Sequence, residues 1–263
     1  MDTIETSNRS VQPDAVNYRN FGPLDQAREG YIPSVVCHVM SSVDGRVKTE
    51  SWSNPYKDYN FKTIMADYRS TAQRLETDAW MLGTTSVKEF FPDHFDGCSC
   101  HKAYKDQLET YVGDCSSDRL FIALVPDGDV KFYDNRFHGD NIICVVGTEV
   151  SADYLEFLES MQISYVFAGP DGKDTKTMLR ALYHNFGIRR IALQGGGIID
   201  GTFWQQQLVS EVSVVVYPGI AATEGQPSIF EATSTMPAGQ SLQLLETELL
   251  KDGCVWLHYK VWK

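Results

Sequence analysis

The sequence predicts an α/β fold in which a mostly parallel central sheet is covered by helices on both faces. Short apolar runs, typical of buried strands, alternate with segments whose apolar residues recur at helical spacing. One run, residues 190–193, breaks at three consecutive glycines and then turns apolar again, which is typical of a strand leading directly into a helix. Near the C-terminus, two more apolar runs flank Asp252-Gly253, a strong turn signal, and predict a terminal antiparallel hairpin.

Composition narrows the class of protein. Of the 263 residues, 43% are hydrophobic and 22% are charged, as in an ordinary soluble globular protein. No apolar run approaches the roughly 18 residues needed to cross a bilayer, and the acidic N-terminus lacks the apolar segment of a secretory signal. A formal charge of −12 would repel a nucleic-acid backbone. We therefore expect a cytoplasmic protein that binds neither membrane nor nucleic acid.

One domain accounts for most of the chain. Residues 1–30 are polar and show no sustained period, so we predict an N-terminal extension followed by a single domain over residues 31–263. Cys37 and Cys144 lie inside predicted strands, where cysteine behaves as a small buried hydrophobe. We expect the six cysteines to be mostly reduced.

The least periodic region, residues 90–118, contains His94, Cys98, Cys100 and His101. Their spacing is not that of an established structural zinc site, and no second Cys-x-x-Cys pair supports one. We predict no metal there.

The first half of the domain is expected to begin with a strand over residues 35–40, followed by a turn at Asp44-Gly45. Apolar residues at helical spacing between Phe61 and Leu75 predict an amphipathic helix. A short buried strand over residues 79–82 then runs into a Gly-Thr loop, and a second helix follows from there.

The second half repeats this alternation. Strands are expected over residues 120–124, 142–146, 165–168, 190–193 and 212–217, and the terminal hairpin over residues 242–249 and 255–262. Ser151 is a plausible N-cap of one intervening helix, and Gly187 ends another. After the three glycines, helical spacing continues through Phe203, Leu208 and Val209, which predicts a helix over this stretch.

The triple glycine, residues 195–197, carries the clearest chemical signal. Residues without a Cβ let a ligand approach the backbone, and the N–H groups that open a helix favour a phosphate. The Gly-Thr loop at residues 83–85 also follows a strand, so both loops are expected to reach one ligand beyond the carboxyl ends of the sheet. A tight turn without a ligand explains the glycines equally well.

Four segments, in this order, resemble one family: residues 39–46 (VMSSVDGR), 78–85 (DAWMLGTT), 194–197 (QGGG), and 211–219 with 227–230 (PSIF). Together they look like the reductase domain of riboflavin biosynthesis, the C-terminal part of the bacterial bifunctional deaminase-reductase. The resemblance implies a three-layer dihydrofolate-reductase-like fold, the cofactor NADPH and a homodimer. Long apolar strands over residues 212–217 and in the hairpin ending at Trp262, whose edges a lone domain would leave exposed, also favour a homodimer.

The resemblance also implies the roles of individual residues. The two glycine loops would hold NADPH, and the loop after residue 146 would border its adenosine half. The cofactor-binding positions are Gly83, Thr84, Thr85, Gly147, Thr148, Gly195, Gly196, Gly197 and Ile198. The substrate-binding positions are Ser42, Asp44 and Gln194. By spacing alone Asp44 is a turn residue, whereas the resemblance implies a catalytic role, in which it relays a proton or orients the substrate.

Two departures from the family affect the expected substrate. Riboflavin-pathway members usually have an acidic residue before the glycines, where this chain has Gln194, and basic residues for a ribose phosphate are not evident. The zinc signature of the deaminase domain is also absent. We expect an NADPH-dependent reductase of a small polar or heterocyclic acceptor with a C=O, C=N or activated C=C bond. The alternatives are the 5-amino-6-(5-phosphoribosylamino)uracil reductase itself and a non-catalytic nucleotide-binding module or sensor.

Overall fold

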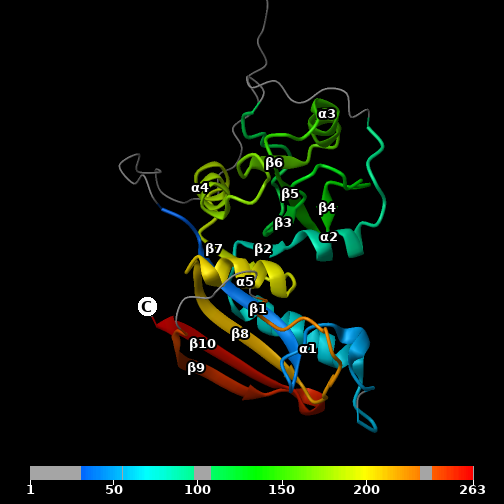
Figure 1. Ribbon diagram of the computed structural model, residues 1–263, viewed down its shortest axis with the longest axis vertical. Coiled ribbons are helices and arrows are strands. Elements are labelled where there is room, and N and C mark those ends of the chain that lie inside the picture. Colours follow the sequence, from blue (N-terminus) through cyan, green and yellow to red (C-terminus); the bar gives the residue numbers. More distant parts are fainter. Residues whose placement is uncertain (1–30, 55, 98–107, 232–238, 263) are drawn as a thin grey trace, which may run out of the picture.

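The computed structural model describes residues 31–54, 56–97, 108–231 and 239–262, and within them ten strands form one mixed sheet (Figure 1). The strands are β1 (Ser34–Ser42), β2 (Ala79–Leu82), β3 (Leu120–Leu124), β4 (Arg136–Phe137), β5 (Asp140–Val146), β6 (Ser164–Phe167), β7 (Arg190–Leu193), β8 (Val209–Tyr217), β9 (Ser241–Leu249) and β10 (Val255–Trp262). Their order is β4-β5-β3-β2-β7-β1-β8-β10-β9, and β6 pairs with β5. The predicted strands and the terminal hairpin are therefore confirmed.

Five helices connect and cover the described strands: α1 (Phe61–Arg74), α2 (Thr84–Phe90), α3 (Ala152–Ser160), α4 (Thr175–Phe186) and α5 (Gly197–Gln205). The predicted caps are present. The Ser151 side chain accepts a hydrogen bond from the backbone N–H of Tyr154, and Gly187 ends α4 with a left-handed backbone.

Side chains alternate across the sheet and produce three layers. On one face, Cys37 and Val39 of β1 join a core with α4 and α5, which contribute Leu182 and Phe203 among others. On the opposite face, α2 and α3 pack over β3 and β5, and α1 packs over β1 and β8. The parallel strands are buried on both faces, as expected for a sheet covered by helices on each side. This arrangement confirms the predicted three-layer fold with a C-terminal antiparallel hairpin.

One boundary predicted from helical spacing is wrong. The helix after the glycines ends at Gln205, and Val209 already begins β8. Gln207 adopts a left-handed backbone conformation (φ 58°), which stops the helix. Leu208 and Val209 are buried because a strand follows, so the apparent helical spacing spanned two elements.

Several expectations concern residues outside the described ranges. The extension over residues 1–30 and the positions Cys98, Cys100 and His101 are among them. Where cysteines are described, at Cys37, Cys115, Cys144 and Cys254, all four thiols are free. The helices of the described ranges are all too short or too polar to span a bilayer.

A buried polar chain connects β1 to α1, β8 and β10. His38 Nε2 lies 3.2 Å from the backbone carbonyl oxygen of Tyr68, so this nitrogen donates. His38 Nδ1 must then accept from the Ser213 hydroxyl at 2.9 Å, and Ser213 Oγ accepts from Trp256 Nε1 at 2.8 Å. The imidazole also stacks on the Tyr68 ring, with 4.4 Å between centroids. Burial lowers the pKa of His38 to about 4.

We expect this histidine to destabilise the protein in mild acid. The unfolded chain binds a proton at His38 near pH 6.5, whereas the folded chain does so only near pH 4. The free energy of unfolding should therefore fall as the pH is lowered from about 6.5 to about 4. Urea unfolding across this range should show a shallower fall for His38→Gln than for the wild type. His184→Gln, at an exposed position of α4, is the control, and an equal slope in all three proteins would contradict the assignment.

Candidate functional site

A cleft of about 680 Å³ opens at the carboxyl ends of β1, β2, β3 and β7. Its lining includes Met40 near the end of β1, Gly83 after β2, Leu124 at the end of β3 and Gln194 after β7. In open α/β sheets this edge is where ligands bind, because several strands end there and helices begin.

The loop between β7 and α5 forms the middle of this cleft. A Cβ added to Gly195 would lie 2.3 Å from the backbone nitrogen of Gly83, so only glycine allows the two loops to touch. Gly196 has a positive φ (58°) and is the N-cap of α5, which therefore has no capping side chain. The first N–H groups of α5, from Gly197 onward, lack intrahelical partners and open beside the cleft.

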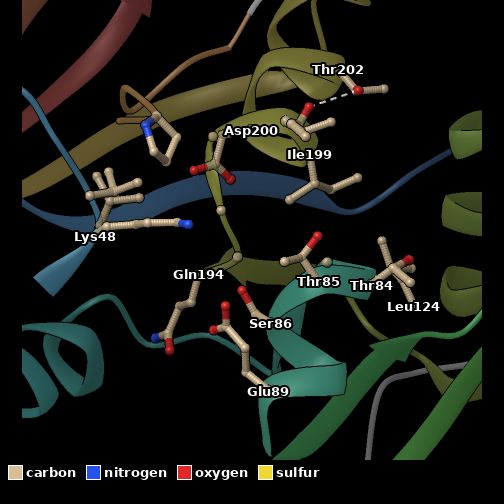
Figure 2. A pocket seen from close by; sticks show the side chains of 18 of the residues that line it. Lys48, Thr84, Thr85, Ser86, Glu89, Leu124, Gln194, Ile199, Asp200 and Thr202 are labelled. Atoms are coloured by element: carbon tan, nitrogen blue, oxygen red, sulfur yellow. Dashed lines mark hydrogen bonds between the residues drawn. The ribbon is translucent and has the colours of Figure 1, made fainter. Parts of the chain in front are cut away.

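The second predicted loop faces the first. Gly83 is the N-cap of α2, and no side chain caps this helix either. Figure 2 shows Thr84, Thr85 and Ser86 on this helix start, across the cleft from α5. Two uncapped helix starts thus border one space, and their partial positive charges suit an anion.

The part of the cleft on one side of the two glycine loops suits the adenosine group of a dinucleotide. There the lining is largely apolar, with Leu124, Pro126 and Met178, and Lys173 adds a positive charge. An adenosine group suits such a surface, and its diphosphate would reach the N–H groups of α2 and α5. The chain therefore has residues that could hold NADPH, which would supply a hydride when bound.

Gly147 and Thr148 do not line the cleft but lie behind its apolar side. The Gly147 N–H donates to the carbonyl oxygen of Pro126, and the Thr148 N–H donates to that of Gly169, each at 2.9 Å. A Cβ on Gly147 would lie 3.1 Å from the nitrogen of Gly172, which does line the cleft. Gly147 and Thr148 therefore stabilise the loops behind the apolar part of the lining and do not face the cleft themselves.

Ser42 and Asp44 also lie outside the lining. The Asp44 carboxylate accepts hydrogen bonds from Ser42 Oγ at 2.7 Å and from the backbone N–H groups of Ala221 and Ala222 at 3.0 Å. The Ser42 hydroxyl, followed by these N–H groups, holds the pKa of Asp44 far below its usual range. At neutral pH this carboxylate has no proton to donate. In this structure the Asp44 carboxylate links the loop after β1 to the loop after β8 by hydrogen bonds.

Two cleft residues were not predicted from the sequence. Lys48 extends its amino group into the cleft from the loop after β1 (Figure 2), and no carboxylate in the described chain lies within ion-pair distance of it. Asp200, in the first turn of α5, lines the cleft while being fully buried. A single lysine in a polar loop forms no sequence motif that would indicate a binding site. Asp200 follows an apolar run that indicates only a helix.

The predicted absence of zinc concerns residues that are mostly outside the described ranges. His94 is described, and its Nδ1 lies 3.8 Å from Asp129 Oδ2. Among the described residues, no three His, Cys, Asp or Glu side chains cluster closely enough to hold a metal ion.

Comparisons with known proteins agree with this architecture. Residues 33–256 match the family described as RibD C-terminal domain. Over 101 residues the chain is 24% identical to the riboflavin biosynthesis protein RibD of Chlamydia trachomatis, which corresponds to 38% of this chain and 27% of that protein.

Solved structures show the same fold. A pyrimidine reductase-like protein from Corynebacterium diphtheriae superposes with a TM-score of 0.61 at 17% identity, covering 88% of this chain and 92% of that one. RibD of Acinetobacter baumannii gives a TM-score of 0.58 at 16% identity, covering 88% of this chain and 58% of that one. The chain thus spans only part of the length of both RibD proteins.

The helix start of α5 yields a direct test of the cofactor geometry. Ile198, the second residue of α5, is 60% exposed and lines the cleft. Ile198→Glu places a negative charge where the helix dipole favours it, so the melting temperature should not fall. The same charge would repel a bound diphosphate, and the NADPH Kd should rise at least about tenfold, or about 1.4 kcal/mol.

Ile198→Gln is the matched control, because it has nearly the same shape without the charge. Its NADPH Kd should stay within about threefold of the wild type, measured by quenching of tryptophan fluorescence. Equal affinity of the Glu and Gln variants would mean that the phosphates lie elsewhere.

Proposed function

Because the chain belongs to the RibD C-terminal domain family, we propose that it is an NADPH-dependent reductase. Its acceptor is a small polar or heterocyclic molecule with a C=O, C=N or activated C=C bond. The observation that carries the proposal is the meeting of two uncapped helix starts, at Gly83 and Gly196, in one cleft. Such a site holds a dinucleotide diphosphate, and hydride transfer then depends mainly on positioning.

The acceptor occupies the half of the cleft away from the apolar adenosine side. This half has polar groups on several elements: Lys48 after β1, Glu89 on α2 and Gln194 before the glycines. The unpaired ammonium of Lys48 favours an acceptor with an anionic group. The phosphate of 5-amino-6-(5-phosphoribosylamino)uracil meets this requirement, which supports the riboflavin-pathway reaction as the specific form of the proposal.

The test measures NADPH consumption by the purified full chain through the change in absorbance. The acceptors are that aminouracil and a panel of other small molecules. Oxidation with any of them supports a reductase, and preference for the aminouracil supports the pathway assignment. Tight NADPH binding without turnover across the panel would instead indicate a nucleotide sensor.

Lys48 provides a prediction about the acceptor. Lys48→Met keeps much of the aliphatic length and removes the charge, so KM for the phosphorylated acceptor should rise about tenfold or more while the NADPH Kd changes little. Lys131→Met removes a charge over the Tyr133 ring, outside the cleft lining, and should leave KM unchanged. An unchanged KM in Lys48→Met would show that the acceptor's anion binds elsewhere.

We also propose a homodimer formed through β9. All nine residues of this strand are exposed, and Leu242, Leu244, Leu245 and Leu249 are among them. The expected free edge at residues 212–217 is absent, because β8 pairs with β1 on one side and β10 on the other. In the described chain β9 pairs only with β10, which leaves an open apolar edge, and such edges favour pairing with another chain. The free thiols support a cytoplasmic setting.

Light scattering at micromolar concentration should give the mass of a dimer for the wild type. Leu245→Glu should shift the protein toward the monomer, because it places a charge on the apolar edge. Tyr133→Glu alters an exposed aromatic side chain near β4, at the other end of the sheet, and should remain dimeric. A monomeric wild type would contradict this part of the proposal.

A further inference from the structure

Asp200 is fully buried and yet lines the cleft. It belongs to the first turn of α5, beside the glycine loop, and its relative exposure is 0%. It also lines the cleft, and Figure 2 shows its carboxyl group directed toward the same part of the cleft as the Lys48 amino group. This is the acceptor half of the site.

The carboxyl group is unsatisfied. Neither Oδ1 nor Oδ2 accepts a hydrogen bond of ordinary geometry among the described residues, although the weak donor Cys37 lies beside them, and neither oxygen is exposed to water. An ionised carboxylate in such a place would cost several kcal/mol. Burial accordingly raises the pKa of Asp200 well above its usual range, and the nearby Cys37 thiol only partly offsets this. This dry environment, poor in donors, therefore favours the protonated, neutral form of the side chain.

The neighbouring titratable groups are poorer proton donors. Tyr68 on α1 also lines the cleft, but its hydroxyl already donates to the carbonyl oxygen of His38, and burial raises its pKa further. Cys37 on β1 is buried beside Asp200 and does not line the cleft, and burial raises its pKa as well. Lys48 faces the cleft as a cation suited to an anionic group. Asp44 is ionised and fixed by three donors.

We propose that Asp200 is the acid that protonates the acceptor during reduction, an inference that rests on the proposed reductase function. The acceptor carbon gains a hydride from the cofactor, and the π electrons of the C=O, C=N or C=C bond move to the partner atom. That atom takes the proton of Asp200, which becomes a carboxylate and regains a proton from solvent after the product leaves. Both carboxyl oxygens are covered in this structure, so the step requires the Asp200 side chain to rotate toward the cleft, and only the weak donor Cys37 opposes that rotation.

The protonation state can be measured on the wild type without any ligand. Among the described residues, Asp200 is the only buried carboxylic acid. Infrared spectra at pH 7 should therefore show the C=O stretch of a protonated carboxyl group, which exposed and ionised Asp and Glu side chains do not give. Asp200→Asn should remove this band. A wild-type spectrum without the band would overturn the inference, whatever the variant does.

Kinetics test the catalytic role, with NADPH and 5-amino-6-(5-phosphoribosylamino)uracil as the probes. Asp200→Asn keeps the shape and neutrality of the protonated acid, so the fold and the NADPH Kd should be retained. Loss of the proton donor should lower kcat by about 100-fold or more. In the wild type kcat should also decline at alkaline pH as Asp200 ionises, and this limb should be absent from the variant.

Asp174→Asn makes the same chemical change at the N-cap of α4, a carboxylate that does not line the cleft, and should keep kcat and its pH profile. If the wild type consumes NADPH and Asp200→Asn keeps kcat within about threefold, Asp200 is not the acid and the reductase assignment stands. If the wild type consumes no NADPH with any acceptor, the proposed function fails, and the catalytic role of Asp200 fails with it.

Discussion

The close contact between the loops after β7 and β2 is the constraint on which the site depends. Gly195 passes so near the backbone of Gly83 that a single added carbon would lie 2.3 Å from its nitrogen. Because β2 and β7 are neighbouring parallel strands, both loops leave the sheet at the same edge. The contact brings the starts of α2 and α5 against one space, and neither helix has a capping side chain to fill it. The proposed binding of an anion in the cleft therefore rests on backbone geometry.

Side chains of the central strand β1 point alternately to the two faces of the sheet, and they position residues in the other half of the cleft. Cys37 faces α5 and lies beside Asp200, whereas His38 faces α1 and supports Tyr68 by a hydrogen bond and by ring stacking. Successive residues of one strand thus position side chains from two different helices, on opposite faces of the sheet. The buried chain from His38 through Ser213 to Trp256 ties this arrangement to the C-terminal hairpin.

Periodicity and turn chemistry were sufficient to predict where nine of the ten described strands lie, the two glycine loops and the terminal hairpin, because these depend on local patterns, whereas the two-residue strand β4 was missed. The end of α5 was missed since Leu208 and Val209 continue the apolar spacing by coincidence while Gln207 turns the backbone. Lys48 was missed because its importance comes from what lies across the cleft, not from its neighbours in sequence. The placement of Gly147 behind Gly172 likewise depends on long-range packing that no local pattern records.

The two aspartates show why residue type alone does not identify a catalytic group. Asp44 sits in a motif that suggests chemistry, yet its exposed carboxylate accepts three hydrogen bonds and is held ionised. Asp200 sits in no motif, yet its carboxyl group is dry, unpaired and next to the cleft. The same functional group is stabilised as an anion by donors in one place and kept neutral by their absence in the other. Of the two, the second environment is the one that favours a carboxyl group carrying a proton, so the supply of hydrogen-bond donors around each carboxyl group bears directly on its role.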